Sequence, residues 1–233
     1  MKFYFDRDRS GALNEFRRAI ELNPSYATAH HWLAQSLSAM GRHEDAIAEI
    51  KLAQQLDPRS AIITTAAGML FFYARQYDQS LVLSRRALEI DPGLVPAHRV
   101  MRWTYQAMDN YNEAMATYRE ERSFSETGGT NGPGWLIVLT QLQAIGGNHA
   151  EARATLAKAV SSSRFKYFAD ILSYEIALAY ESINERDQAF LWLSRADTVK
   201  AHSFNFALVD PRLDRIRTDP RFAELMRKAG FNN

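Results

Sequence analysis

Small and apolar residues recur at helical spacing in this chain, and the same pattern returns several times along the sequence. Three segments each have a small residue, a usually larger one four positions later, and Ala seven positions later. These sets are Ala12, Phe16 and Ala19; Ala46, Ile50 and Ala53; and Ser80, Ser84 and Ala87. Positions i, i+4 and i+7 share one face of an α-helix. The pattern therefore predicts helices whose small side chains let a second helix approach closely.

Each of these helices is followed by the same stop signal. Asn23-Pro24, Asp57-Pro58 and Asp91-Pro92 stand 34 residues apart, and Pro cannot continue a helix. A 34-residue period of helix pairs resembles the tetratricopeptide repeat. The resemblance implies an all-α fold, a right-handed solenoid of antiparallel helix hairpins that forms a superhelix.

The pattern continues beyond a Gly-rich stretch at 125–134, with longer spacing. The fourth repeat has Glu121 where Ala is expected and lacks the closing Pro, and two further stripes follow the stretch: Ala152, Leu156 and Ala159, and then Ala189, Leu193 and Ala196. We expect one solenoid over 1–233 with twelve principal helices. Its parts are a half repeat at 1–24, regular repeats at 25–58, 59–92 and 93–126, a connector at 127–134, longer repeats at 133–167 and 168–205, and a C-terminal cap at 206–233.

The N-terminal helix, expected over 7–22, lacks most of the partner helix that a complete hairpin needs. Only residues 1–6 precede it, so the apolar side chains of Phe16 and Ile20 need another cover, because repeats are stabilised mainly by their neighbours. We expect that the chain is cut from a longer protein. The other covers are a folded-back N-terminus or a second copy in a homodimer through the half repeat.

The C-terminus carries a second resemblance, to the closing segment of bacterial multidomain regulators. Its elements are Asp210-Pro211, Leu213, Ile216-Arg217, Asp219-Pro220-Arg221-Phe222, Leu225 and Gly230. Asp219 can cap a final helix with Pro220 at its first position, and Phe222 and Leu225 would then plug the end of the stack. The resemblance implies part of a bacterial signalling or transcription regulator, in which such arrays accompany a winged-helix domain, a protein kinase or a nucleotide cyclase.

Composition removes several classes of partner. The 28 Lys and Arg balance 27 Asp and Glu, for a net charge of +1, so no overall field favours nucleic acid. No apolar run approaches the roughly 20 residues of a membrane span, and the absence of Cys removes disulfides and thiolate sites. We expect a cytoplasmic protein, or else the periplasmic part of a membrane-anchored regulator.

No catalytic, metal or cofactor motif is present in the sequence. HED at 43–45 has Ile47 where a zinc-binding HExxH motif needs its second His, and GGTNGPG lacks the Lys-Ser/Thr of a phosphate-binding loop. His30 and His98 share the packing register of their helices, which favours a structural role. We therefore predict no enzyme activity, no metal and no cofactor.

The remaining candidate surface is the inner stripe of the first helices, which lines the concave groove in arrays of this type. The predicted groove residues are His31, Gln35, Thr65, Met69, Phe72, Tyr73, Arg99, Trp103, Gln106, Gln141 and Tyr174. Aromatic residues flanked by Arg and amides are typical of a peptide-binding hot spot. This composition predicts a scaffold that binds a peptide or protein segment. Two alternatives stay open: curvature buries these residues against neighbouring helices, or the domain senses a small molecule for a missing output domain.

Overall fold

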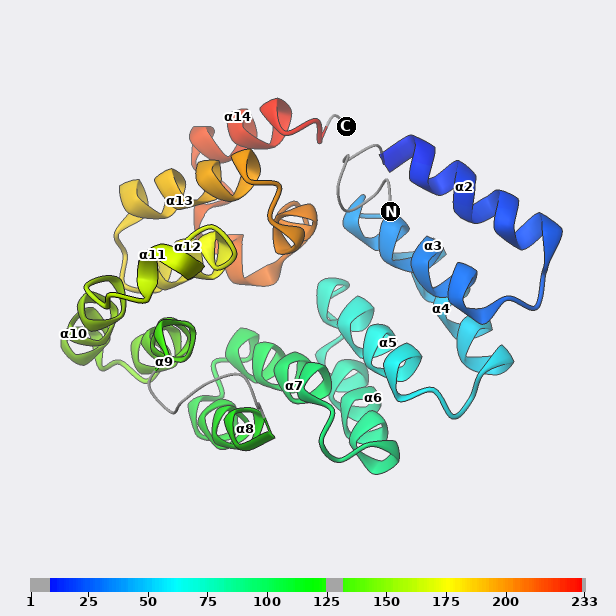
Figure 1. The fold of residues 1–233 in the computed structure, drawn as a ribbon, viewed down its shortest axis with the longest axis horizontal. Coiled ribbons are helices and arrows are strands. Elements are labelled where there is room, and N and C mark those ends of the chain that lie inside the picture. The colour runs from blue at the N-terminus through cyan, green and yellow to red at the C-terminus, as the bar shows by residue number, and fades with distance from the viewer. Residues whose placement is uncertain (1–8, 125–131, 232–233) are drawn as a thin grey trace.

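The computed structural model describes residues 9–124 and 132–231. Within these ranges every regular element is a helix and none is a strand, which confirms the all-α prediction. The helices follow a ring-shaped path that brings α14 back toward α2 (Figure 1). The Gly-rich connector and the short N-terminal segment of the half repeat lie mostly or wholly outside the described residues.

The helices form five antiparallel pairs between a single first helix and a C-terminal region. The first helix is α2 (Arg9–Leu22), and the pairs are α3 (Ala27–Ala39) with α4 (His43–Leu56), α5 (Ala61–Tyr73) with α6 (Tyr77–Ile90), α7 (Val95–Ala107) with α8 (Tyr111–Phe124), α9 (Pro133–Ile145) with α10 (His149–Val160), and α12 (Ser173–Ser182) with α13 (Arg186–Thr198). The shorter elements are α11 (Phe165–Phe168), the 3-10 helices η1 (His202–Phe206) and η2 (Pro211–Ile216), and α14 (Pro220–Lys228). The twelve principal helices of the sequence prediction are present among the described residues, and the three shortest elements are additional.

The turn inside each hairpin depends on one residue in the left-handed region. Gly41 has φ 78°, and the equivalent residues Arg75 and Asp109 have φ 60° and 54°. After Gly41, the Arg42 N–H donates to the Leu37 carbonyl at 3.0 Å, a bond that closes the end of α3 in a Schellman motif. The same local signal therefore ends the first helix of successive repeats.

The small-residue stripes lie where the hairpins are tightest. Ala46, Ile50 and Ala53 of α4 are all buried, and Ala152 and Ala159 of α10 are fully buried. A Cβ atom at Gly68 would lie 2.9 Å from the Ser84 hydroxyl oxygen, so α5 approaches α6 more closely there than Ala would allow. The predicted stripes therefore form the contact between the two helices of each pair.

The C-terminal region does more than cap the stack. Asp219 caps α14 by accepting from the Arg221 N–H, Pro220 begins the helix, and Phe222 and Leu225 are buried against the last repeat. The chain between α13 and α14 instead turns inward, and η1 and η2 lie inside the ring (Figure 1). Residues 202–217 are called the inner segment below. The sequence prediction of a cap at the end of the stack therefore omits the inner segment, which fills the interior of the ring.

Candidate binding surface on the concave face

The predicted groove residues lie on the inner helices, and most are covered. Only Arg99 is exposed and only Met69 is half-buried; the others are buried, namely His31, Gln35, Thr65, Phe72, Tyr73, Trp103, Gln106, Gln141 and Tyr174. The structure therefore does not show these side chains lining an open groove. Their role in binding a partner stays a prediction.

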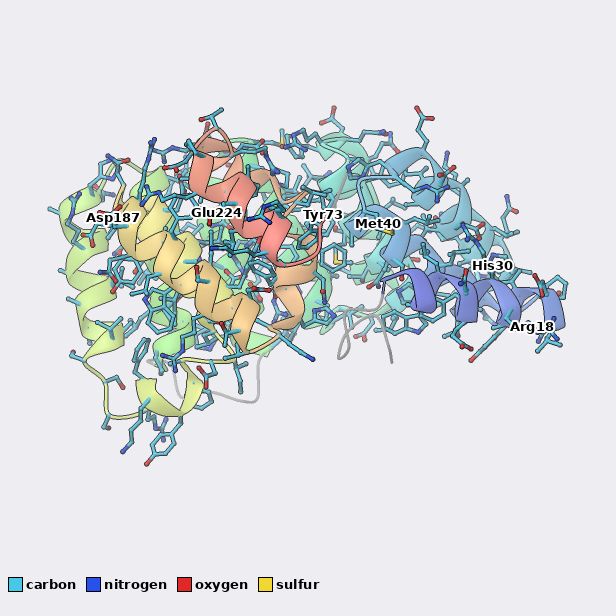
Figure 2. The ribbon with its side chains drawn as sticks, turned by 90° about the horizontal axis from the view of Figure 1, so that it is seen from above. Arg18, His30, Met40, Tyr73, Asp187 and Glu224 are labelled. Atoms are coloured by element: carbon cyan, nitrogen blue, oxygen red, sulfur yellow. The ribbon has the colours of Figure 1, made fainter. Side chains whose placement is uncertain are left out.

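An aromatic cluster at the centre of the concave face is covered by the inner segment. The rings of Tyr73 and Phe206 stack with centroids 4.7 Å apart and planes inclined by 6°. Behind them, Phe72 lies 6.0 Å from Trp103. Val209 joins the same buried cluster. In Figure 2 Tyr73 lies at the boundary between the N-terminal helices and the C-terminal region.

Arg212 of the inner segment bridges the two sides of the ring. Its guanidinium lies over the Trp103 ring at 4.4 Å from the centroid, which is a cation–π arrangement. The same group donates to Asp210 at 2.8 Å and to Glu175 at 3.4 Å. Burial lowers the pKa of Arg212, but the two carboxylates outweigh burial and raise it. The cation is therefore fixed in its charged form between α7 and α12.

Asp210 is the fully buried centre of this polar cluster. It accepts from the Tyr174 hydroxyl at 2.8 Å, and the Arg217 guanidinium donates to its backbone carbonyl at 2.9 Å. Burial and the neighbouring Asp210 carboxylate together raise the pKa of Tyr174 well above its usual value. The phenol thus stays protonated and donates to Asp210.

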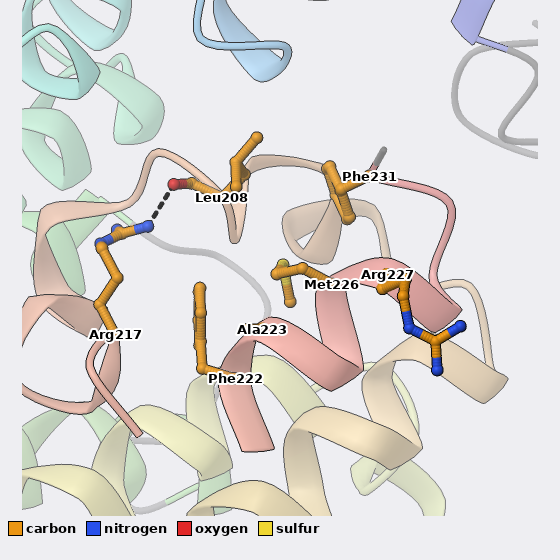
Figure 3. Close-up of a pocket in the computed structure, with 7 residues that line it drawn as sticks. All are labelled: Leu208, Arg217, Phe222, Ala223, Met226, Arg227 and Phe231. Atoms are coloured by element: carbon orange, nitrogen blue, oxygen red, sulfur yellow. Dashed lines mark hydrogen bonds between the residues drawn. The ribbon is translucent and has the colours of Figure 1, made fainter. Parts of the chain in front are cut away.

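The inner segment also makes an exposed contact at the rim of the ring. Arg75, at the turn after α5, donates to Asp214 at 2.6 Å, and both side chains are 43% exposed. On the other side of the segment, Arg217 donates to the Leu208 carbonyl above an open pocket of about 420 Å³ (Figure 3). Phe222 and Met226 of α14 line the floor of this pocket.

A second buried polar group lies further round the ring. Arg102 donates to Glu121 at 2.7 Å and to Gln106 at 2.9 Å, and Gln106 lies 3.4 Å from Gln141 of the next repeat. Burial raises the pKa of Glu121, but Arg102 and then Arg99 outweigh it, so the pKa falls below its usual value. A paired carboxylate therefore replaces the small residue that the repeat pattern expects there.

The two repeated histidines have matching structural positions. The Nε2 atoms of His30 and His98 lie 3.0 Å from the carbonyl oxygens of Pro24 and Pro92, so each ring ties its helix to the preceding loop. In the described ranges, no three His, Asp or Glu side chains gather as a metal site would require. Nor is any helix of those ranges long and apolar enough to cross a membrane.

The residues that cover the concave face are not evident from the sequence. The sequence predicts only a cap for the region that contains Asp210 and Arg212, and it does not distinguish Phe206 from the other residues of that cap. The available signal is the apolar set Phe204, Phe206 and Val209, which is typical of buried residues. It lies in a segment too short for a further hairpin. Nothing local in that signal indicates which helices it packs against.

Comparisons with known proteins agree with the repeat pattern. A TPR repeat profile matches residues 9–41, and a tetratricopeptide repeat profile matches residues 27–60. The chain is 28% identical over 86 residues to small glutamine-rich tetratricopeptide repeat-containing protein 2 of Mycosarcoma maydis, covering 37% of this chain and 24% of that protein. It is 25% identical over 115 residues to TPR repeat-containing protein YpiA of Bacillus subtilis (strain 168), covering 49% and 27%. The alignments thus span about a quarter of each relative.

Solved structures share the fold at low identity. The crystal structure of TTC0263, a thermophilic TPR protein of Thermus thermophilus, superimposes with a TM-score of 0.60 at 19% identity, over 82% of this chain and 94% of that one. The two profile matches show tetratricopeptide repeats within residues 9–60, and the shared architecture shows that the described chain has the fold of a tetratricopeptide repeat array.

Proposed function

We propose that this array is a scaffold that binds a segment of another protein at its concave face. The observation that supports the proposal is the way this face already holds a segment without α-helix, residues 202–217, by ring stacking and charged hydrogen bonds. Buried aromatic and Arg anchors are the contacts that dominate protein interfaces. A face that holds residues 202–217 through these contacts is suited to a segment of another protein that carries similar side chains.

The accessible part of the face gives the proposal a direct test. A peptide-display library would be selected on the full chain, and bound peptides would be mapped by hydrogen exchange and by variants. We expect Met69→Ala and Arg99→Ala to weaken binding, because these are the predicted groove residues that are not buried. Tyr167→Ala and Ile171→Ala, which change exposed side chains outside the predicted groove, serve as controls. Peptides that respond only to the control pair would place binding elsewhere and contradict the proposal.

We also propose that this array is part of a bacterial signalling or transcription regulator. The support is the resemblance of residues 209–231 to the closing segment of such regulators, and both Asp-Pro pairs of that segment act as helix caps here. Cross-linking in the native cells followed by mass spectrometry would identify the partner. Exclusive capture of metabolic enzymes would count against this assignment.

A small-molecule sensor remains the alternative function, and it would need an enclosed site. The pocket beside α14 is open, with Ala223 and Arg227 exposed at its edge, whereas small-ligand sites enclose most of their ligand. The concave face holds protein side chains where a ligand would sit. Both features favour the scaffold over the small-molecule sensor. A scaffold needs no catalysis by the array itself.

A further inference from the structure

The inner segment has two faces, and they differ in how firmly they are held. One face packs with α12, α13 and α14 in a continuous core that includes Phe204, Leu213 and Ile216. The other face crosses the ring and packs on α3, α5 and α7 through Phe206 and Val209. The first face belongs to the last repeat, whereas the second joins parts of the chain that are distant in sequence.

The contacts across the ring belong to a different cluster from the core of the last repeat. They include the stack of Phe206 on Tyr73, the Arg212 cation over Trp103, and the exposed pair of Arg75 with Asp214. An exposed ion pair of this kind contributes little to stability. The N-terminal side of this contact could therefore separate while the last repeat keeps its core.

Unpaired polar atoms further weaken the covered arrangement. The Trp103 Nε1 atom and both side-chain amide atoms of Asn205 are buried, and none has a hydrogen-bond partner in the part of the chain that the structure describes. Asn205 is fully buried and Trp103 is 9% exposed. Buried donors and acceptors without partners cost free energy. The Trp103 N–H would find a partner in water or in another occupant once the inner segment moved away from that ring.

The rest of the boundary between the two halves of the ring is narrow. The α7–α8 pair meets α9 through a smaller contact than the other neighbouring pairs share. It includes a bond from the Tyr118 hydroxyl to the Trp135 carbonyl at 3.2 Å and the contact between Gln106 and Gln141. Separation of the inner segment from α3, α5 and α7 would thus leave the contact of α7 and α8 with α9, which also includes the apolar cluster of Tyr105, Tyr118 and Leu142, as the joint between the halves.

We propose that the surface formed by α3, α5 and α7 binds a protein segment without α-helix that carries an aromatic side chain and a carboxylate, and that the inner segment is its resident occupant. The partner enters by replacing Phe206 on Tyr73 and Asp214 on Arg75. Arg99, which is exposed on α7 and pairs with Glu121 at 3.0 Å, offers a second cation to an acidic partner. This inference rests on the proposed scaffold function and specifies its partner and its regulation.

The test measures the distance across the ring in the full chain. The protein contains no Cys, so Gln76→Cys and Thr218→Cys, both at exposed positions next to the Arg75–Asp214 pair, allow two spin labels to be attached specifically. The probe is a synthetic peptide with the sequence of residues 202–217. We expect one short distance in the labelled chain alone, and a second, longer distance whose fraction rises to saturation with peptide. A peptide with Phe206→Ala and Asp214→Asn should have no effect.

Variants test the resident occupant without added peptide. Asp214→Ala removes the exposed pair with Arg75 and also the pair with Arg217 at 3.0 Å, of which only the first crosses the ring. It leaves the apolar core intact, and we expect it to raise the long-distance fraction by up to about fivefold, the range of an exposed ion pair. Asp187→Ala is the matched control, because it removes an exposed pair with Arg221 at 2.7 Å away from the ring interior. A single short distance in Asp214→Ala and at saturating peptide would overturn the inference. If display-selected peptides still bind the concave face in that case, the scaffold function stands and only the resident occupant is wrong.

Discussion

Arg102 and Glu121 form an ion pair inside the α7–α8 hairpin, with Nε 2.7 Å from Oε2 and both side chains 2% exposed. The equivalent residues of the two preceding hairpins are small: Ala34 with Ala53, and Gly68 with Ala87. Two small residues have thus been replaced together by a buried cation and a buried anion. The departure of Glu121 from the repeat pattern is explained by its partner on the facing helix.

This relationship predicts a large effect of Glu121→Ala on stability. The substitution leaves the Arg102 guanidinium buried without its carboxylate, and breaking a buried pair in this way costs ~3–5 kcal/mol. Urea denaturation followed by circular dichroism measures the free energy of unfolding. We expect the double variant Arg102→Ala with Glu121→Ala to lose less than the sum of the two single losses.

Arg99→Ala provides a control on the same carboxylate. Arg99 lies 3.0 Å from Glu121 but is 45% exposed, so its loss should cost less than ~1 kcal/mol. Equal losses of unfolding free energy in Arg99→Ala and Glu121→Ala would show that the buried pair of Arg102 with Glu121 contributes no more to stability than the exposed pair.

The small-residue stripe predicts the positions at which a larger side chain destabilises the array. Ala46→Trp or Ala152→Trp should lower the melting temperature strongly, because overpacking a tight contact costs ~1–3 kcal/mol or more. Ala48→Trp and Ala154→Trp are matched controls on the same two helices, at exposed positions. Similar melting temperatures for buried and exposed variants would show that the stripe has been assigned to the wrong face.

The helices were predictable because their signals are local and recur with the repeat. Gly41 and Pro58 mark a turn and a helix end whatever the rest of the chain does, and a 34-residue period carries the register of one hairpin to the next. The contact of Tyr73 with Phe206 has no such signal, because it joins the second complete hairpin to the C-terminal region. The helices that carry the predicted groove residues could therefore be found from sequence, but not the segment that covers them.

His31 makes the stability of the N-terminal repeats sensitive to acid. Burial lowers its pKa from 6.5 to about 4, and the Gln35 amide nitrogen, which can only donate, lies 2.6 Å from Nε2. The folded chain therefore holds a neutral ring while the unfolded chain takes up a proton below pH 6.5. The stabilising contribution is complete above pH 6.5 and declines as pH falls toward 4, by roughly 2 kcal/mol between pH 7 and pH 5.

Urea denaturation at several pH values tests this contribution. We expect His31→Gln to flatten the dependence of the free energy of unfolding on pH between 7 and 5. His149→Gln, which changes an exposed histidine, should leave the dependence as it is in the parent chain. If the free energy of unfolding of His31→Gln depends on pH as it does in the parent chain, burial does not lower the pKa of His31 in the folded chain.

The last prediction is that α2 is the weaker end of the array. Among the described elements its main neighbour is α3. It buries Ala12 and Leu13, leaves Phe16 and Ile20 half-buried, and ends at an exposed Leu22. At the other end, α14 buries Phe222, Leu225 and Met226 in the core of the last repeat. Since each apolar side chain of this size contributes ~1.5–3 kcal/mol when fully buried, amide exchange should be faster in α2 than in α14.

Hydrogen exchange at several protein concentrations separates the possible covers of α2. If a second copy covers Phe16 and Ile20, exchange over residues 11–22 should slow as concentration rises, because the dimer forms by mass action. If a longer chain supplies the cover, exchange should stay fast at every concentration and slow only when that chain is present. Slow exchange that does not depend on concentration would instead indicate an intramolecular cover. Full protection of α2 in a monomer from which residues 1–6 have been deleted would show that a half repeat needs no cover, and the predicted weakness of this end would be wrong.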